Sequence, residues 1–273
     1  MHKYKLPLEE RLKKLLSFPK ALHSPLFKAA EYALDSGGKR LRPLLMLSLL
    51  DALNYPWEKA LDAASSLECI HTYSLIHDDL PCMDNDDFRR GRPTVHKAFD
   101  EATAILAGDF LLTYAFEIIA KSKEIPSSVK SKLIQILSYR AGGQGMIAGQ
   151  MIDFLFEGKK MREKDLLLMH CKKTAYLFAA SFEFSAILAD LSFQKRKLFR
   201  KMGLCYGLCY QLADDIEDAE EDLILKKATS VTLFGKARTL QLHKSFFALF
   251  EKYFAILFDL SGILWIKESL QIC

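Results

Sequence analysis

Apolar residues recur at helical spacing through most of the chain, whereas the alternating pattern of β-strands is scarce. Leu41, Leu44, Leu45 and Leu49, for example, lie three or four residues apart and share one face of a helix. Turn-forming segments such as Ser36–Gly38 separate successive runs. The sequence therefore predicts an all-α fold of about ten helices joined by short connections.

The composition is that of a folded globular protein. Of 273 residues, 50% are hydrophobic and 26% are charged, which leaves ample apolar material for a core and excludes disorder as the main state. No Pro-, Gly- or Ser-rich linker divides the chain, so we expect a single domain over residues 1–273. The net charge of +4 is too small to indicate nucleic-acid binding, and we expect none.

Three features favour a cytoplasmic protein with no integral membrane span. The segment Met1–Lys20 is charged throughout and has no apolar stretch of the kind found in secretory signals. The nearest approach to a membrane span, Phe246–Ile266, is interrupted by Glu251, Lys252 and Asp259, and we expect a buried amphipathic helix there. The six cysteines lack metal-binding spacing and are typical of reduced core residues.

Two largely apolar helices, predicted over Ala60–Leu80 and Phe199–Ile216, each end in a run of aspartates. The first run contains Asp78, Asp79 and Asp84, and the second contains Asp214, Asp215 and Asp218. An acidic run by itself is more often a solvated face or a helix cap. Here the carboxylates follow buried helices and lie near helix C-termini, where negative charge is costly unless a cation compensates it.

Carboxylate ligands suit a hard cation such as Mg²⁺ or Mn²⁺ better than zinc or copper. Magnesium usually takes one or two carboxylates and leaves its other positions to water and phosphate oxygens. In the second run, Asp214 and Asp218 lie four residues apart and share a helix face with Gln211. The two clusters therefore predict several magnesium ions shared with a phosphorylated ligand.

Basic residues supply the opposite charge. Lys39 and Arg42 lie three residues apart, and Arg89–Arg92, Lys172–Thr174 and Lys226–Lys227 follow further along the chain. Each group alone is more often a solvated patch, but guanidinium forks and lysines also bind phosphate oxygens. Nucleic acid would be repelled by the aspartates, and no P-loop motif is present. A metal-bound diphosphate accounts for both signs of charge.

Several motifs occur in a fixed order that resembles the trans-isoprenyl diphosphate synthases, the farnesyl and geranylgeranyl diphosphate synthase family. The resemblance runs from about Tyr32 to Asp218, with a shorter match at Lys227–Gly235. The matching segments are Gly37–Pro43, Glu68–Pro81, Met83–Asp87, Arg89–Gly91, Ala107–Asp109, Gly149–Gln150, Lys173–Thr174 and Gln211 with Asp214–Asp215.

The resemblance implies an isoprenoid-synthase-like helical bundle around a central cavity, with the two aspartate clusters facing each other, and a homodimer. It implies a prenyltransferase that condenses isopentenyl diphosphate with dimethylallyl or geranyl diphosphate and gives mainly farnesyl diphosphate. The allylic C–O bond ionises, the double bond of isopentenyl diphosphate attacks the cation, and a proton is lost. Mg²⁺, expected as three ions, stabilises the departing diphosphate.

The resemblance also assigns individual residues. Isopentenyl diphosphate is expected at Lys39, Arg42, His71 and Arg90, and the allylic diphosphate at Arg89, Lys173, Thr174, Gln211 and Lys227. Metal ligands are expected at Asp78, Asp84 and Asp214, with Asp79, Asp215 and Asp218 as supporting residues and Gln150 and Asp153 nearby. The predicted catalytic set is the six aspartates of the two clusters together with Lys173.

Product length is predicted from the helix before the first cluster. Tyr73 lies five residues before Asp78, or about 7.5 Å along the helix axis, and its ring, next to Ser74, is predicted to limit the product to C15. The insertion Pro81-Cys82 fits farnesyl synthases, whereas the surrounding sequence also resembles geranylgeranyl synthases. The simpler alternative is that Tyr73 is only a core residue.

The chain departs from the family after the second cluster, because only the eight residues Ala219–Lys226 separate Asp218 from Lys227. A lysine that binds the allylic diphosphate in the longer family loop has no counterpart here unless Lys226 replaces it. Four alternatives stay open: a geranylgeranyl diphosphate synthase, a weakly active or non-catalytic partner subunit, a terpene cyclase of the same fold, and a helical scaffold that binds no diphosphate. The Cys205–Cys209 spacing resembles that of partner subunits, but helical core spacing explains it equally well.

Overall fold

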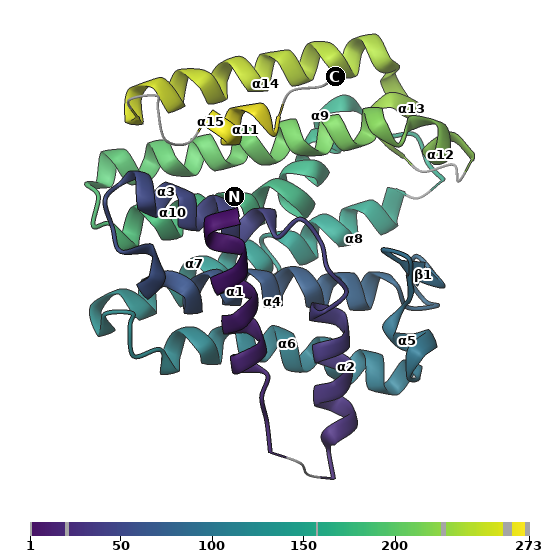
Figure 1. Ribbon diagram of the computed structural model, residues 1–273. Helices are drawn as coiled ribbons and strands as arrows, with labels where there is room; N and C mark the ends of the chain where they lie inside the picture. Colours follow the sequence, from purple (N-terminus) through teal and green to yellow (C-terminus); the bar gives the residue numbers. More distant parts are fainter. Residues whose placement is uncertain (1, 20–21, 157, 225–227, 259–263, 271–273) are drawn as a thin grey trace. The chain divides into compact units, whose positions relative to one another are not determined.

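The computed structural model describes residues 2–19, 22–156, 158–224, 228–258 and 264–270 (Figure 1). Within these ranges the chain forms fifteen α-helices and one two-stranded hairpin, so the predicted all-α fold is confirmed. Four of these helices, α5, α12, α13 and α15, have six residues or fewer.

The helices form two compact units. Unit 1 comprises residues 1–48 and 56–134, and unit 2 comprises residues 49–55 and 135–273. Two of the three boundaries fall within α3 (Leu41–Ala52) and α7 (Ser127–Ala141), and the third lies between Tyr55 and Pro56. The expectation of a single domain over residues 1–273 stays a prediction.

Unit 1 is built around α4 (Leu61–Asp78). This helix packs against α1 (His2–Leu15), α2 (Ser24–Leu34) and α6 (Glu101–Lys121), and α5 (Val95–Ala98) covers one end of α6. The short turn η1 (Trp57–Ala60) precedes α4. Gly108 permits the close approach of α6 to α4, because a Cβ there would lie 2.1 Å from Nε2 of His77. The predicted helix Ala60–Leu80 is thereby confirmed to within two residues.

Unit 2 is built around α11 (Phe193–Glu217), which lies alongside α10 (Tyr176–Leu188) and α14 (Lys236–Leu257) (Figure 1). The other elements of this unit are α8 (Met146–Phe156), α9 (Glu163–His170), η2 (Cys171–Ala175), α12 (Ala219–Ile224), α13 (Ser230–Phe234) and α15 (Leu264–Glu268). Helix α11 begins before the predicted Phe199, because the hydroxyl of Ser192 caps it by accepting from the N–H of Lys195.

Of two sequence-based expectations about apolar helices, the bounds of one helix are corrected and the absence of an integral membrane span stays a prediction. The helix expected over Phe246–Ile266 ends at Leu257, where Phe258 takes an extended conformation. One helix of the described chain, α6, is long and apolar enough to cross a membrane. Because α6 packs on α2, α4 and α5, and because core helices of soluble proteins share its length and composition, it is weak support for a membrane span.

Candidate functional site

The first aspartate cluster is shaped by a tight turn after α4. The N–H of Asp84 donates to the carbonyl of Asp78 over 2.8 Å, and the N–H of Asn85 donates to the carbonyl of Leu80 over 3.1 Å. Asn85 has a left-handed φ of 55°, a conformation that asparagine tolerates better than most residues. The turn places the backbones of Asp78 and Asp84 side by side, with the Asp84 side chain exposed.

Asp79 is buried and holds an arginine. Its Oδ1 accepts from Nε of Arg89 over 2.5 Å, and Nη2 of Arg89 also lies 3.2 Å from Oδ2 of Asp86. Burial raises the pKa of Asp79 to about 6, although the charge of Arg89 opposes the shift. Asp79, one of the predicted catalytic residues, therefore holds Arg89 in place. Arg89 is itself predicted to bind the allylic diphosphate.

Arg89 and Arg90 lie on a hairpin that the sequence did not predict. Strands β1 (Phe88–Arg89) and β2 (Arg92–Pro93) pair antiparallel across a two-residue turn. Both turn residues, Arg90 and Gly91, have positive φ, of 55° and 75°. This is the geometry of a type I′ turn, which matches the twist of short hairpins and projects Arg90 from its tip.

The hairpin tip contacts the loop that carries the first basic motif. Nη1 of Arg90 donates to the carbonyl of Gly37 over 2.5 Å and lies 3.5 Å from Oγ of Ser36. Gly38 leaves room for this contact, because a Cβ there would lie 2.6 Å from Cζ of Arg90. The same loop carries the exposed Lys39. Two predicted ligands of isopentenyl diphosphate, Lys39 and Arg90, are thus brought to one loop.

His71 lies among guanidinium groups. Burial lowers the pKa of His71 well below its usual value, and the charges of Arg42, Arg90, Arg40 and Arg89 lower it further. The imidazole is therefore neutral at pH 7 and offers one N–H as a neutral hydrogen-bond donor. His71, Arg42 and Arg90 are thus close enough to interact electrostatically, and their shared role in binding isopentenyl diphosphate stays a prediction.

Tyr73 is buried on α4, with its ring edge-to-face on His77 at 5.8 Å between centroids. Its hydroxyl has no hydrogen-bond partner within the described residues. Burial, followed by the charge of Asp78, raises the pKa of Tyr73 to about 12, so the phenol stays neutral. Ser74 donates to the carbonyl of His71 over 2.9 Å and is thereby used within its own helix.

In unit 2, Lys173 and Thr174 lie on the π-helical turn η2, a kind of helix irregularity that is frequent at functional sites. Nζ of Lys173 contacts Oδ2 of Asp153 on α8 at 2.5 Å. The hydroxyl of Thr174 donates to Oε1 of Gln211 over 2.6 Å. Three residues predicted to bind the allylic diphosphate, Lys173, Thr174 and Gln211, are therefore on neighbouring elements of one unit.

Two glycines allow helices to approach this turn closely. A Cβ at Gly149 of α8 would lie 2.2 Å from the backbone nitrogen of Lys173. A Cβ at Gly207 of α11 would lie 2.4 Å from Cα of Ala175. Because both obstacles are backbone atoms, any side chain at either position forces the elements apart.

We expect Gly149→Ala to destabilise the protein by about 1–3 kcal/mol, the typical cost of overpacking, and to displace Lys173, which under its predicted role weakens binding of the allylic diphosphate. Urea unfolding and the KM for the allylic diphosphate measure the two effects. Gly143→Ala is the matched control, since a Cβ at Gly143 meets nothing within 4 Å. Equal behaviour of the two variants would show that the close contact has no consequence.

Asp215 is buried and fully engaged. Its Oδ2 accepts from the N–H of Ser230 over 2.7 Å and from the hydroxyl of Ser230 over 2.6 Å, and it lies 3.2 Å from Nε2 of His170. Its Oδ1 accepts from Nε2 of Gln211 over 2.9 Å. Burial alone raises a carboxyl pKa, but these donors outweigh it and the pKa of Asp215 is lowered. Asp215 is thus an ionised anchor for Gln211 and α13.

The other residues of the second cluster lie toward solvent. Asp214 is half-buried and Asp218 is exposed, and the N–H of Asp218 donates to the carbonyl of Asp214 over 2.9 Å at the end of α11. Gln150 is half-buried on α8. Lys227 lies outside the described residues, so its predicted role stays a prediction.

The donor set of the two clusters fits magnesium. Asp78, Asp84 and Asp214 offer carboxylate oxygens only, as a hard cation prefers. Among the described residues there is no group of three or more His, Cys, Asp or Glu side chains poised to hold a metal ion. Magnesium bound through one or two carboxylates, with water and phosphate oxygens completing its shell, needs no such group.

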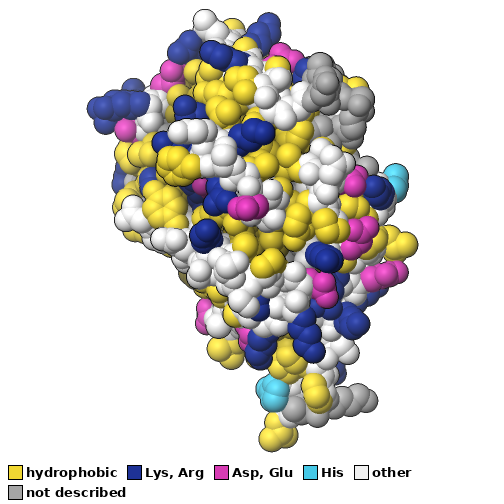
Figure 2. Space-filling model, turned by 90° about the vertical axis from the view of Figure 1, so that its left-hand side faces the viewer, with side chains coloured by type: hydrophobic (Ala, Val, Ile, Leu, Met, Phe, Trp, Pro, Cys, Tyr) yellow, Lys and Arg dark blue, Asp and Glu magenta, His cyan; other side chains and the backbone are white. Residues whose placement is uncertain are grey.

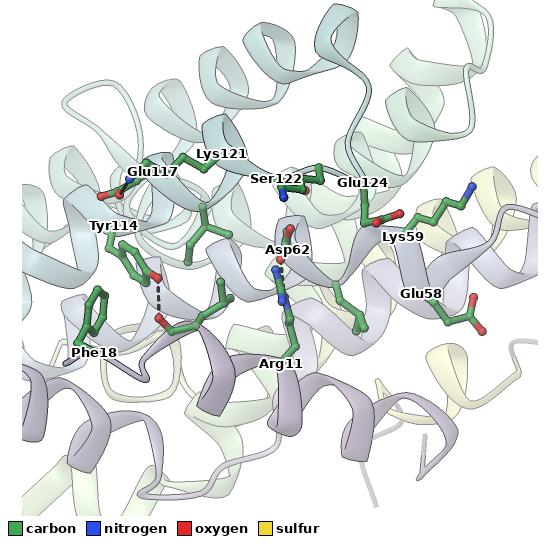
Figure 3. Close-up of a pocket in the computed structure, with 14 residues that line it drawn as sticks. Arg11, Phe18, Glu58, Lys59, Asp62, Tyr114, Glu117, Lys121, Ser122 and Glu124 are labelled. Carbon is green, nitrogen blue, oxygen red and sulfur yellow. Dashed lines mark hydrogen bonds and ion pairs between the residues drawn. The ribbon is translucent and has the colours of Figure 1, made fainter.

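A pocket of about 580 Å³ lies in unit 1 at the other end of α4 (Figure 3). Nε of Arg11 on α1 donates to Oδ1 of Asp62 over 2.6 Å, and the hydroxyl of Tyr114 donates to the carbonyl of Leu15. Asp62 precedes Asp78 by sixteen residues, or about 24 Å of helix. None of the predicted site residues lines this pocket, which is therefore separate from the aspartate cluster.

The chain is similar to known prenyl diphosphate synthases in sequence and structure. Residues 23–230 match the family model described as polyprenyl synthetase. The chain is 51% identical to a farnesyl diphosphate synthase of Geobacillus stearothermophilus over 165 residues, 60% of this chain and 56% of that protein. It is 41% identical to the Haemophilus influenzae farnesyl diphosphate synthase over 247 residues, 84% of each chain.

A solved structure of the geranyltransferase from Helicobacter pylori, complexed with magnesium and isoprenyl diphosphate, matches 98% of this chain and 94% of its own. The TM-score is 0.84 and the sequence identity 35%. The chain belongs to the polyprenyl synthetase family. This membership confirms the resemblance inferred from the motifs. The match to the first of these relatives spans just over half of that protein's length.

Some polar residues of this family member were not predicted from its sequence. Arg40, Glu68, His170 and Ser230 are buried and contact predicted site residues or the segments that carry them. For Arg40 and Glu68 a signal was present, since they lie inside the motifs Gly37–Pro43 and Glu68–Pro81. The others depend on contacts between residues far apart in the sequence.

Proposed function

We propose that the chain is a magnesium-dependent trans-prenyltransferase that condenses isopentenyl diphosphate with dimethylallyl and geranyl diphosphates and gives mainly farnesyl diphosphate. The observation that carries the proposal is that Arg90 contacts the loop of Lys39 and Arg89 contacts Asp79, in the same unit as the aspartate turn Asp78–Asp84, where the charges of these arginines also act on His71. Cationic side chains bind the oxygens of a diphosphate, and carboxylates bind its magnesium ions.

Isopentenyl diphosphate binds to Lys39, Arg42, His71 and Arg90 in this proposal. The two arginines supply planar forks for phosphate oxygens, and Lys39 supplies an exposed point charge. His71 is neutral and contributes a hydrogen bond. The double bond of this substrate then acts as the nucleophile, so no side-chain nucleophile is required.

The allylic diphosphate binds to Arg89, Lys173, Thr174, Gln211 and Lys227. Asp79 orients Arg89 within unit 1, and Asp153 and Asp215 orient Lys173 and Gln211 within unit 2, so each of these three donors is held by a carboxylate of its own unit before substrate arrives. A preorganised donor costs no rearrangement when charge develops on the departing diphosphate.

We propose that Asp78, Asp84 and Asp214 hold magnesium, as three ions, and that both clusters ligate ions of one allylic diphosphate. Asp218, whose backbone N–H donates to the carbonyl of Asp214 at the end of α11, is proposed as a supporting residue. When bound, magnesium supplies the positive charge that makes diphosphate a good leaving group. Apolar side chains such as Tyr73 keep water from the allylic cation.

Product length provides a test of Tyr73. We expect Tyr73→Ala to shift the main product from C15 to C20 or longer, because removal of a buried ring opens space along α4. Tyr73→Phe should keep C15, because the hydroxyl has no hydrogen-bond partner within the described residues. Chromatography of the dephosphorylated products measures the shift. A Tyr73→Ala enzyme that still stops at C15 would refute the role of the ring, and a wild-type C20 product would favour the geranylgeranyl alternative.

We further propose a homodimer that works in the cytoplasm. One face of α8 carries four half-exposed apolar residues, Ile147, Met151, Phe154 and Leu155. Hydrophobic patches are also visible among Lys and Arg side chains in Figure 2. Exposed apolar surface of this kind is typical of protein–protein interfaces. Five cysteines of the described chain are free, as in a reducing compartment. Sedimentation equilibrium should give twice the mass of one chain.

The activity is tested by mixing the protein with Mg²⁺, isopentenyl diphosphate and dimethylallyl diphosphate. We expect magnesium-dependent release of pyrophosphate and a C15 product. Absence of turnover by the protein alone would indicate a partner subunit that needs a second chain. Hydrocarbon formed from farnesyl diphosphate alone would indicate a cyclase.

A further inference from the structure

Arg40 is a buried arginine in the middle of the first basic motif. Its side chain is only 1% exposed, whereas its neighbour Lys39 is exposed and Arg42 is half-buried. Arg40 also has a left-handed φ of 47°, a conformation that costs free energy for a residue with a Cβ. Both features require surroundings that hold the residue in place.

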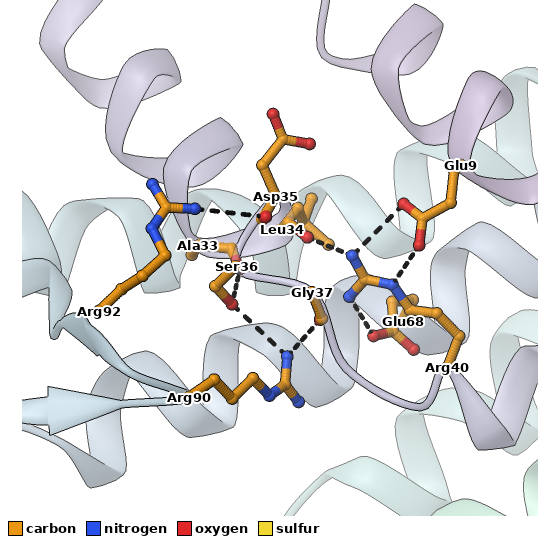
Figure 4. Close-up of polar contacts among 10 residues, drawn as sticks. All are labelled: Glu9, Ala33, Leu34, Asp35, Ser36, Gly37, Arg40, Glu68, Arg90 and Arg92. Carbon is orange, nitrogen blue, oxygen red and sulfur yellow. Dashed lines mark hydrogen bonds and ion pairs between the residues drawn. The ribbon is translucent and has the colours of Figure 1, made fainter.

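One guanidinium joins the motif to three helices (Figure 4). Nη1 of Arg40 donates to Oε1 of Glu68 on α4 over 2.7 Å, and its Nε donates to Oε1 of Glu9 on α1 over 2.9 Å. Its Nη2 donates to the carbonyl of Leu34 at the end of α2. Glu68 is 2% exposed, so Arg40 provides the charge that makes its burial tolerable.

The contacts of Arg40 reach the residues proposed to bind isopentenyl diphosphate. Lys39 is the preceding residue and Arg42 lies two residues further on, at the start of α3. Glu68 lies three residues before His71, on the adjacent turn of α4. The pair Arg40–Glu68 therefore fixes the loop that carries Lys39 to the helix that carries His71.

Two further guanidinium groups hold the same loop, at carbonyls rather than at carboxylates. Arg90 donates to Gly37 and Arg92 donates to Asp35 over 3.3 Å (Figure 4). Both are at the hairpin, and Arg90 is itself a proposed substrate ligand. Arg40 is the buried member of these three, so it can set the loop without contacting substrate.

We propose that Arg40 is a positioning residue for isopentenyl diphosphate, acting through the ion triad Glu9–Arg40–Glu68 on Lys39, Arg42 and His71. This inference rests on the proposed function. Misplacement of binding groups by about 1 Å can cost on the order of 10²-fold in rate, so loss of the triad has a large expected effect without any direct contact.

The test separates positioning from folding. A buried ion pair replaced by apolar residues of similar size often leaves stability unchanged, whereas removal of one partner leaves an uncompensated charge. The variant is therefore Arg40→Met with Glu68→Met, which removes the buried pair and leaves Glu9, whose side chain is 26% exposed, to water. Arg40→Lys is the conservative single change. The matched control is Arg11→Met with Asp62→Asn, which removes an ion pair that also joins α1 to α4, about 24 Å of helix from the first cluster.

The measurements are the KM for isopentenyl diphosphate, the KM for the allylic diphosphate and the melting temperature. We expect the Met double variant to raise the KM for isopentenyl diphosphate about tenfold or more and to leave the allylic KM within about twofold, because the triad acts on Lys39, Arg42 and His71. We expect a smaller but equally selective increase for Arg40→Lys, since one amine cannot replace the fork. The control should change neither KM.

A folded Met double variant with an unchanged KM for isopentenyl diphosphate would overturn the positioning role, as would an equal rise of both KM values. If that variant does not fold, Arg40→Lys decides by the same criterion. Wild-type protein without turnover on isopentenyl diphosphate would overturn the proposed function together with this inference. Wild-type turnover combined with an unselective variant would overturn this inference alone.

Discussion

Asp78→Asn should reduce kcat/KM by about 10²–10³-fold, the usual cost of losing one preorganised charge contact in the transition state. The carboxamide keeps the size of the side chain and the turn that places Asp84 beside it, because that turn is made by backbone hydrogen bonds. The loss therefore reports on the charge. Steady-state release of pyrophosphate at saturating Mg²⁺ measures it.

Asp87→Asn is the matched control in the same acidic run. Asp87 is exposed and pairs with Lys97 at 2.8 Å, a surface contact of small energetic value. We expect this variant to retain nearly full activity. If both variants lose activity equally, the acidic run acts through its total charge and the specific role of Asp78 is wrong.

Asp215→Asn should lower the free energy of unfolding by about 3–5 kcal/mol, as is typical when one partner of a buried charged network is removed. The carboxamide would direct its NH₂ group at the donors of Ser230 or Gln211, which Asp215 now satisfies. Urea unfolding measures the loss. Asp190→Asn is the control, since Asp190 pairs with Arg196 on the surface and should leave stability unchanged.

The same network predicts a pH dependence. Because the pKa of Asp215 is lowered on folding, its contribution is present above the ordinary carboxyl pKa and is lost as the pH falls through the lowered value. The stability difference between wild type and Asp215→Asn should therefore shrink only in acid, below about pH 4. A difference that already disappears at neutral pH would contradict the assignment.

The sequence predicted the helices that carry the aspartates because their patterns are local. The apolar run before Asp78 and the run before Asp214 have helical spacing, and α4 and α11 follow them closely. The hairpin at Arg90 was missed because its turn contains no Asn-Gly or Asp-Gly pair. The π-turn at Lys173 was missed because its geometry depends on packing against Gly149 and Gly207.

Of the candidate site, the sequence predicted which residues are involved better than what each one contacts. Asp78 and Asp79 are adjacent, yet Asp79 is buried on Arg89 while Asp78 is partly exposed. Likewise Asp215 is engaged by Ser230, fifteen residues away, whereas Asp214 faces more to solvent. Spacing alone cannot distinguish neighbouring carboxylates whose partners come from distant segments.

The central claim is that both aspartate clusters ligate the magnesium ions of one diphosphate. It is tested most directly by calorimetric titration of the protein with inorganic pyrophosphate in saturating Mg²⁺. The same titration in EDTA measures the binding that needs no magnesium, and this binding is subtracted. We predict one magnesium-dependent pyrophosphate per chain, with an affinity that falls in Asp78→Asn and also in Asp214→Asn. Two independent pyrophosphates per chain, each abolished by only one of the variants, would contradict the account.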